Sequence, residues 1–228
     1  MEKDKLIIKP IGHSPNSKVL KEYKMTLKNL NNIQYEAAIG LMLGDASLQS
    51  QNKGKTHRLK FEWSDRNKDY VEHVYELFNE WVLSLPHKKS RINKNDNTVI
   101  TWGFQTISHE AFNILKELFL TKESKSIIPN LIKNHLTKRG LAYWFMDDGG
   151  KLDYNNNSHN KSIVLNTQSF TEEEVTILNK ELSNKFKLKT EIRINKNKYV
   201  IVIKSDNYNW FLSLIDPYII PSMRYKLP

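Results

Sequence analysis

The stretch that most constrains this chain runs from Leu141 to Gly150 and reads LAYWFMDDGG. Its apolar and aromatic residues end abruptly in two carboxylates and two glycines. A helix this apolar is typical of a protein interior, so its C-terminal end would carry a carboxylate into buried surroundings. A shorter version, AAIGLMLGD, occupies Ala37 to Asp45. We therefore expect the function of the chain where these two segments end.

Composition narrows the class of protein. The chain has 228 residues, 39% hydrophobic and 26% charged, which is typical of a folded globular protein with one large or two smaller domains. It contains no cysteine, which excludes disulfides, thiolate metal sites and cysteine nucleophiles. The apolar runs are shorter than a bilayer span, and the N-terminal MEKDKLIIKP lacks the features of a signal or transit peptide. We expect an intracellular protein with no membrane partner.

The formal charge of +10 favours a polyanionic partner, with nucleic acid as the commonest, although a basic but inert surface is the alternative. The abundance of Asn, Lys and Ile, which have A/T-rich codons, hints at an AT-rich genome such as that of a mitochondrion.

Periodicity predicts two rounds of helix, hairpin, helix, hairpin, helix. After an amphipathic helix over 17–30, the first round has helices at Asn32–Asp45, Asp69–Val82 and Ser108–Leu120, and strands at Ser47–Lys53, His57–Trp63, Ser90–Lys94 and Thr98–Gln105. After the run at 141–150, the second has strands at Lys151–Tyr154, Ser162–Gln168, Thr190–Asn195 and Lys198–Lys204, and helices at Thr171–Phe186 and Asp206–Ile215. Ile92, Ile100, Trp102 and Phe104 are expected to face the core.

Asp148 follows Asp45 by 103 residues, and aligning the two superimposes the rounds, which indicates an internal duplication. The fold class is therefore α+β, with two related αββαββα halves, each a four-stranded antiparallel sheet covered by helices on one face. We predict a basic N-terminal segment at 1–30, a first half at 31–126, a linker at 127–138 and a second half at 139–228.

Gly40 and Gly44 lie on one face of the first apolar helix. Glycine costs a helix about 1 kcal/mol relative to alanine, so close approach of another backbone is the natural reason for a pair of them. The alternative is a helix that merely tolerates glycine.

If the two apolar helices pack together, Asp45 and Asp148 emerge side by side at their C-terminal ends. The helix dipoles and mutual repulsion disfavour both carboxylates there, and Mg²⁺ would relieve both effects. Free carbonyls at Gly44 and Asp147 could add ligands. This set predicts metal-assisted phosphodiester hydrolysis, and two unrelated aspartates are the alternative.

Lys125 lies 80 residues after Asp45, and Lys226 lies 78 after Asp148. A lysine at the same place in each half could steady a phosphate or polarise attacking water. In a chain this rich in lysine, each could also be a solvated surface residue.

The outer faces of the two sheets and their flanking loops form the predicted DNA-binding surface, because an antiparallel ribbon of strands fits the major groove. Most lysines there would contact phosphate. The candidates are Lys53, Lys55, Arg58, Lys60, Lys88, Lys89, Arg91, Lys151, Arg193, Asn195, Lys196, Lys198 and Lys204.

The segments LAYWFMDDG and AAIGLMLGD resemble the two motifs of the LAGLIDADG homing endonucleases, in the single-chain form that carries both. The resemblance covers nearly the whole chain, including PNSK, LKEYK, WVLSLPHKK, SIVLNTQSF, INKNK and YKLP. It implies a saddle of two halves on a long asymmetric DNA site, cut on both strands across the minor groove to leave short 3′ overhangs.

By motif position the resemblance makes Asp45 and Asp148 the catalytic metal ligands and places Lys125 and Lys226 near the two active sites. It implies Mg²⁺ as cofactor, with Mn²⁺ as a substitute and Ca²⁺ as a cation that binds without supporting cleavage. The motifs differ at Gly44 against Asp147 and at Gly40 against Tyr143, so we expect unequal sites, and no metal contact from the Asp147 side chain.

The first hypothesis is a monomeric endonuclease that promotes mobility of its own intron or element, with double-stranded DNA as partner. The alternatives are an RNA maturase that binds intron RNA and a DNA-binding regulator without catalysis. The chain has both aspartates and both lysines, which favours the nuclease. We expect an organelle-encoded mitochondrial protein that is not secreted, with a cytoplasmic or nucleoid location as the alternative.

Overall fold

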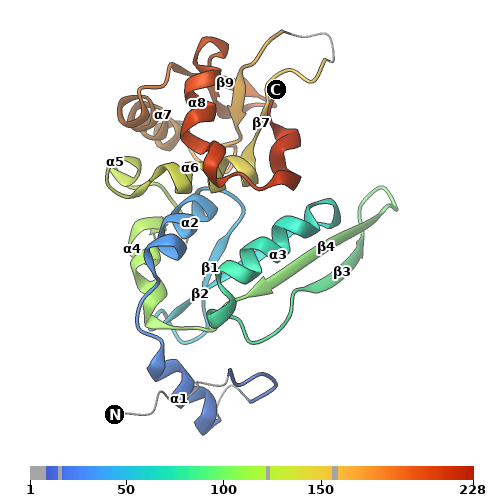
Figure 1. Cartoon of the computed structure of the whole chain (residues 1–228), viewed down its shortest axis with the longest axis vertical. Coiled ribbons are helices and arrows are strands. Elements are labelled where there is room, and N and C mark those ends of the chain that lie inside the picture. The colour runs from blue at the N-terminus through green and yellow to red at the C-terminus, as the bar shows by residue number, and fades with distance from the viewer. Residues whose placement is uncertain (1–8, 15–16, 122–123, 156–158) are drawn as a thin grey trace. The chain divides into compact units, whose positions relative to one another are not determined.

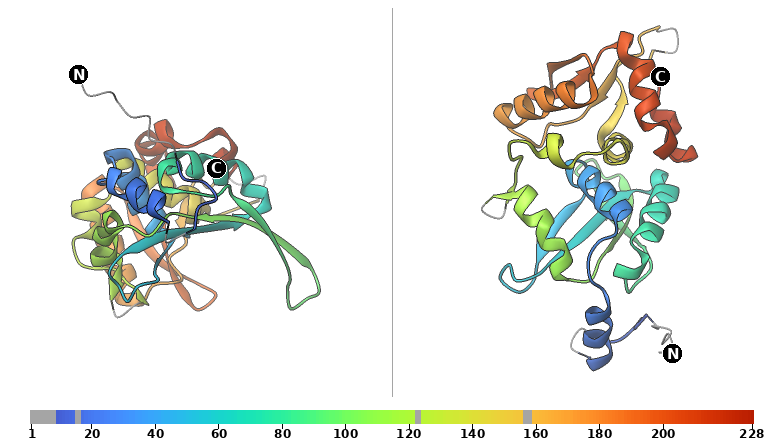
Figure 2. Two further views of the ribbon diagram at one scale, coloured as in Figure 1. Left: turned by 90° about the horizontal axis from the view of Figure 1, so that it is seen from below. Right: turned by 60° about the vertical axis from the view of Figure 1, so that its left-hand side comes forward.

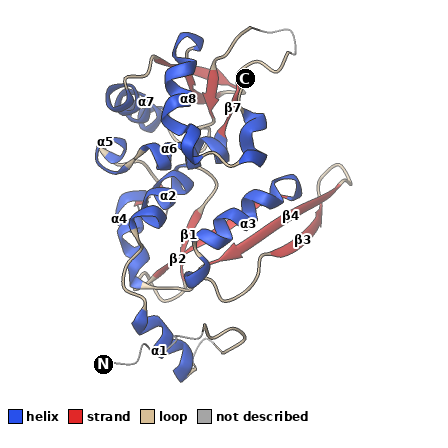
Figure 3. Ribbon diagram, in the orientation of Figure 1, coloured by secondary structure: helices blue, strands red, loops and turns tan. Residues whose placement is uncertain are grey.

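The computed structural model describes residues 9–14, 17–121, 124–155 and 159–228. Figures 1 and 3 show helices and antiparallel sheets in the predicted α+β order. The helices are α1 (Lys18–Thr26), α2 (Asn32–Leu43), α3 (Lys68–Leu77), α4 (Asn113–Phe119), α5 (Leu131–His135), α6 (Lys138–Asp148), α7 (Glu172–Phe186) and α8 (Tyr208–Ile215). The strands are β1 (Ser47–Ser50), β2 (His57–Ser64), β3 (His87–Ile92), β4 (Thr98–Gln105), β5 (Leu120–Thr121), β6 (Ser124–Lys125), β7 (Gly149–Lys151), β8 (Ile163–Leu165), β9 (Thr190–Asn195) and β10 (Lys198–Ile203).

The chain forms two compact units, and their borders differ from those of the predicted halves. One unit comprises residues 1–31 and 48–113, and the other comprises 32–47 and 114–228. Helix α2 belongs to the second unit because it packs against α6. The predicted linker at 127–138 contains α5. No helix in the described ranges is both long and apolar enough to cross a membrane.

The sheet of the first unit has the order β1-β2-β4-β3. Strand β2 alternates as predicted: Leu59, Phe61 and Trp63 are buried, while the residues between them are partly exposed. Phe61 pairs with Phe104 across the β2–β4 ladder, and their rings lie 4.8 Å apart. Since directly paired residues share a face of a sheet, the apolar face and the outer face follow from this register.

The prediction that Ile92 faces the core is wrong, because its side chain is 72% exposed. Ile92 pairs with Thr98 and shares the face of Phe104, so the alternation itself is correct. Figures 1 and 2 show why it stays exposed: the β3–β4 hairpin extends beyond α3, and no helix among the described residues lies over its tip.

The sheet of the second unit has the order β7-β8-β10-β9. Its helix-covered face carries Ile163, Leu165, Ile201 and Ile203, all fully buried. The hairpin turn at Lys196 and Asn197 has positive φ at both residues, as a tight two-residue turn requires.

Helix α7 follows the prediction closely, beginning after the N-cap Thr171, whose capping box with Glu174 is formed, and ending at Phe186. Other boundaries move by a few residues. Helix α3 ends at Leu77, and a 3₁₀ turn at Asn79–Trp81 continues it; this turn keeps Phe78 and Trp81 buried although the α-helix has stopped. Strand β7 begins at Gly149, two residues earlier than predicted, directly at the end of α6.

Candidate active site and nucleic-acid interface

Helices α2 and α6 pack closely against each other where both carry glycine. A Cβ atom added at Gly40 would lie 2.0 Å from the Gly140 carbonyl oxygen and 2.9 Å from the Cβ of Tyr143. The two backbones therefore touch where the sequence predicted a close approach. Both helices are buried almost throughout, including Leu41, Met42, Trp144 and Phe145 at zero exposure. Each such side chain contributes roughly 1.5–3 kcal/mol through burial.

Asp45 and Asp148 lie at these helix ends and act on each other electrostatically. Burial, followed by repulsion from Asp45, raises the pKa of Asp148 to about 7, against an ordinary value of 3.8. The positive charges of Lys125 and Lys226 oppose this rise. The prediction that α2 and α6 bring two carboxylates together is therefore consistent with the geometry.

The two lysines occupy equivalent places. Lys125 Nζ donates to the Gly44 carbonyl at 2.6 Å, and Lys226 Nζ donates to the Asp147 carbonyl at 2.6 Å. Each lysine thus binds the carbonyl that immediately precedes a motif aspartate. Burial lowers the pKa of Lys125, and the carboxylates of Asp148, Asp147 and Asp45 counteract this. The expectation that the Gly44 and Asp147 carbonyls are free is wrong, since each accepts a hydrogen bond from a lysine, although a carbonyl oxygen has a second lone pair that can bind a cation.

The donor set suits a hard divalent cation. The described ranges contain no cluster of three or more His, Cys, Asp or Glu side chains that could hold a metal by itself. Two carboxylates and the carbonyls beside them are the available donors, and Mg²⁺ characteristically binds one or two carboxylates and completes its shell with water and phosphate oxygens. A cation between Asp45 and Asp148 would also relieve the repulsion that raises the Asp148 pKa.

The outer face of the first unit's sheet carries several of the predicted DNA-binding residues. Arg58 and Lys60 lie on β2, and Lys60 pairs with Gln105. Arg91 is exposed on β3. Lys89 shares this face but is held in an ion pair by Glu62 at 2.6 Å, and its hydrogen bond is the main reason why the pKa of Glu62 is lowered. Lys53 and Lys55 are exposed in the β1–β2 loop, as predicted.

Three predicted positions need correction. Lys88 and Lys89 were expected in a loop but lie within β3, which begins directly after Pro86. Lys88 pairs with Trp102 on the face of Phe104, and therefore points away from the outer face. Lys151 pairs with Ile163, a buried residue of the helix-covered face, and directly paired residues share a face, so Lys151 lies on that side of the other sheet.

The outer face of the second unit's sheet is less basic than predicted. Arg193 and Lys204 both form ion pairs with Glu191. The buried Val164, Val200 and Val202 form an apolar cluster in the middle of this face.

Exposed polar residues at the β9–β10 turn of this sheet include Asn195, Lys196 and Lys198.

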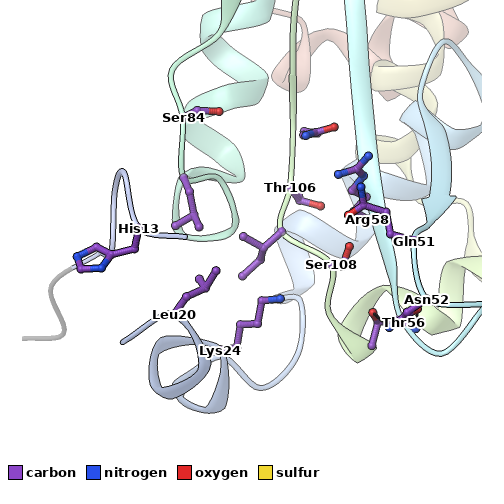
Figure 4. A pocket seen from close by; sticks show the side chains of 13 residues that line it. His13, Leu20, Lys24, Gln51, Asn52, Thr56, Arg58, Ser84, Thr106 and Ser108 are labelled. Atoms are coloured by element: carbon purple, nitrogen blue, oxygen red, sulfur yellow. Dashed lines mark hydrogen bonds between the residues drawn. The ribbon is translucent and has the colours of Figure 1, made fainter. Parts of the chain in front are cut away.

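A pocket of about 360 Å³ lies between α1 and the end of β2, entirely within the first unit (Figure 4). His13, Lys24 and Arg58 line it together with amide and hydroxyl side chains, and no carboxylate is among its lining residues in the described part of the chain. Burial lowers the pKa of Lys24, and the buried Arg58 Nε has no hydrogen-bond partner among the described atoms. These features suit an anion such as phosphate. The sequence did not single out His13 or Lys24, because only folding brings α1 beside β2.

Comparison with known proteins places this arrangement in a family. The chain is 48% identical over 217 residues to "Probable intron-encoded endonuclease 1" of Wickerhamomyces canadensis, covering 95% of this chain and 93% of that protein. The solved structure of the homing endonuclease I-WcaI bound to its DNA recognition sequence superimposes with a TM-score of 0.91 at 46% identity, covering 95% of each chain. The "Cytochrome b mRNA maturase bI2" of Saccharomyces cerevisiae is 28% identical over 97% of this chain and 55% of its own length. The profile of the LAGLIDADG DNA endonuclease family matches residues 35–211, and the chain belongs to that family.

Proposed function

We propose that this protein is a site-specific endonuclease that hydrolyses both strands of double-stranded DNA at a long asymmetric site with a divalent metal. The observation that carries the proposal is the meeting of Asp45 and Asp148 at the ends of α2 and α6, each beside a lysine bound to the preceding carbonyl. The relatives named as intron-encoded endonucleases and the DNA-bound structure of I-WcaI support the same conclusion.

Asp45 and Asp148 would hold the metal, with the Gly44 and Asp147 carbonyls as candidate further ligands. A bound Mg²⁺ supplies a polarised phosphate oxygen and a water of lowered pKa. The chain's own residues provide the rest. Lys125 and Lys226 fix the main chain beside each aspartate. Their positive charges oppose the tendency of Asp148 to take up a proton. The reaction breaks the P–O3′ or P–O5′ bond by addition of water; short 3′ overhangs remain the predicted outcome.

The DNA-binding surface is proposed from the outer faces of the two sheets. Arg58, Lys60 and Arg91 serve the first face, and the β9–β10 turn residues Asn195, Lys196 and Lys198 serve the second. Lys53 and Lys55 would contact phosphate from the β1–β2 loop. The pocket at Lys24 offers a further place for a phosphate group. Because these contacts release counterions, affinity should fall steeply with salt.

The test is cleavage of the intron-free form of the host gene in the presence of Mg²⁺. We expect Asp45→Asn and Asp148→Asn to abolish double-strand cutting while DNA affinity stays within about threefold, since neither aspartate is proposed as a DNA contact. Asp69→Asn, an exposed carboxylate in the first turn of α3, serves as the control and should cut normally. Equal loss of binding and cutting in the two motif variants would contradict the assigned role.

The similarity to a cytochrome b mRNA maturase supports a second candidate, an RNA maturase. Tight binding of intron RNA with no DNA cleavage at any exon junction would favour it over the endonuclease. A mitochondrial location, intron coding and a monomeric state also belong to the proposal. Selective quantification of the protein in isolated mitochondria and light scattering of the purified protein with and without DNA test them.

A further inference from the structure

The side chain of Asp147 takes a position that its place in the motif does not explain. Asp147 is 8% exposed, and its Oδ2 accepts the backbone N–H of Asp45 at 3.0 Å. Its carboxylate therefore reaches across from α6 to the main chain that carries the other motif aspartate. A hydrogen bond to a charged acceptor in a buried place is among the stronger ones in proteins.

The two helices end differently, and this difference explains why one of them needs a contact from its neighbour. Helix α2 stops at Leu43, and beyond it the Ala46 N–H bonds the Leu41 carbonyl, so the last turn widens around Asp45. Helix α6 continues through Asp148, and the Gly149 N–H bonds the Phe145 carbonyl. Asp45 therefore lies beyond the end of its helix, whereas Asp148 is still part of its own.

The Asp148 main chain is held from within its own half. The backbone N–H and the side-chain Nδ2 of Asn166 both donate to the Asp148 carbonyl, each at 2.9 Å. Asn166 follows β8, the strand paired with β7, which begins directly after Asp148. The sheet thus supports Asp148, and α6 supports Asp45.

Glycine at position 44 makes the contact across the helices possible. A Cβ atom at Gly44 would lie 2.4 Å from the Cβ of Asp147 and 2.5 Å from its Oδ2. The Asp147 carboxylate fills the space of the side chain that position 44 lacks. For the same reason α2 offers no equivalent side chain to the main chain of Asp148.

We propose that Asp147 is a positioning residue for the Asp45 active site alone. Its carboxylate fixes the Asp45 main chain and thereby the side chain that would hold the metal, while the Asp148 site does not depend on it. This inference rests on the proposed function and adds that each motif aspartate contributes mainly to cutting one strand. A substitution at Asp147 should therefore slow cleavage of one DNA strand more than cleavage of the other.

The experiment compares Asp147→Ala with Asp147→Asn under single-turnover conditions, on duplexes labelled on one strand or the other. Alanine removes the acceptor, whereas asparagine retains an oxygen acceptor and removes only the charge. We expect alanine to slow one strand at least tenfold, with the other strand within about twofold of wild type and nicked DNA accumulating. We expect asparagine to restore both rates to within about threefold of wild type.

A readout that needs no cleavage is amide hydrogen exchange at Asp45. We expect exchange of the Asp45 N–H to accelerate at least tenfold in Asp147→Ala, with Ala46 and Asp148 unchanged and asparagine close to wild type. Equal slowing of both strands, or asparagine as impaired as alanine, would overturn the proposal. Should the wild-type protein cut neither strand, the proposed function fails, while the exchange measurement still decides whether Asp147 holds Asp45. Circular dichroism on each variant identifies any loss of folding, and the asparagine variant, nearly identical in shape, then carries the exchange test.

Discussion

Replacing Asp148 with asparagine should stabilise the protein above neutral pH in the absence of divalent cation. The pKa of Asp148 is raised from 3.8 to about 7, mainly by burial and by repulsion from Asp45. A carboxyl group whose folded-state pKa exceeds its unfolded value binds its proton more tightly when folded. The folded state therefore loses stability as the pH rises from about 4 to about 7, where this partly buried group ionises.

The magnitude follows from that rise in pKa. At 1.36 kcal/mol per pKa unit, ionisation of Asp148 costs the folded protein about 4 kcal/mol above pH 7, and nothing below pH 4. Asparagine has the same shape and does not ionise. We therefore expect Asp148→Asn to raise the free energy of unfolding by up to about 4 kcal/mol at pH 8 relative to its effect at pH 4.

Urea denaturation in EDTA at several pH values, for wild type, Asp148→Asn and the exposed control Asp69→Asn, measures this difference. The control should show no comparable pH-dependent gain. Added Mg²⁺ should reduce the difference in free energy of unfolding between Asp148→Asn and wild type at pH 8, because the ion stabilises only the protein that retains both carboxylates. A difference between Asp148→Asn and wild type that stays constant from pH 4 to pH 8 would refute the argument from burial and repulsion.

Two further predictions concern the helix contact and the DNA-facing sheet. Gly40→Ala should lower the free energy of unfolding by about 1–3 kcal/mol or more, and by more than Gly140→Ala, since the added Cβ meets backbone at 2.0 Å in the first case and at 2.8 Å in the second. Thermal unfolding of both variants shows which one loses more stability. A larger loss in Gly140→Ala than in Gly40→Ala would contradict the packing argument. Glu62→Gln should release Lys89 from its ion pair and tighten DNA binding about two- to fivefold at low salt, in line with the modest energy of exposed pairs. Fluorescence anisotropy measures this, and Glu117→Gln, an equal charge change on α4, should leave the affinity unchanged.

The sequence by itself determined the order of elements, and it predicted which residues meet at the motif ends. Alternation along β2 and the capping box at Thr171 are local patterns, and the chain obeys them because each is decided by neighbours a few residues away. Gly40 and Gly44 indicated close backbone contact, because only a close neighbour justifies two glycines on one face of a helix. The paired aspartates and lysines followed from the duplication.

Other features were decided only by the tertiary structure. They depend on which part of a sheet a helix covers, on the register of the strands and on where a helix ends. Ile92 has the correct alternation but lies beyond the reach of α3, so it is exposed. The β7–β8 register pairs Lys151 with Ile163 and so places it on the helix-covered face. Glu62 and Glu191 form ion pairs with basic side chains that the sequence had predicted to bind DNA.

Asp147 illustrates the limit of sequence reasoning most directly. Its motif position predicted a contribution from its carbonyl only, yet its carboxylate binds the Asp45 main chain across the helix contact. No local pattern encodes that hydrogen bond, because it exists only where α2 and α6 meet and Gly44 leaves room for it.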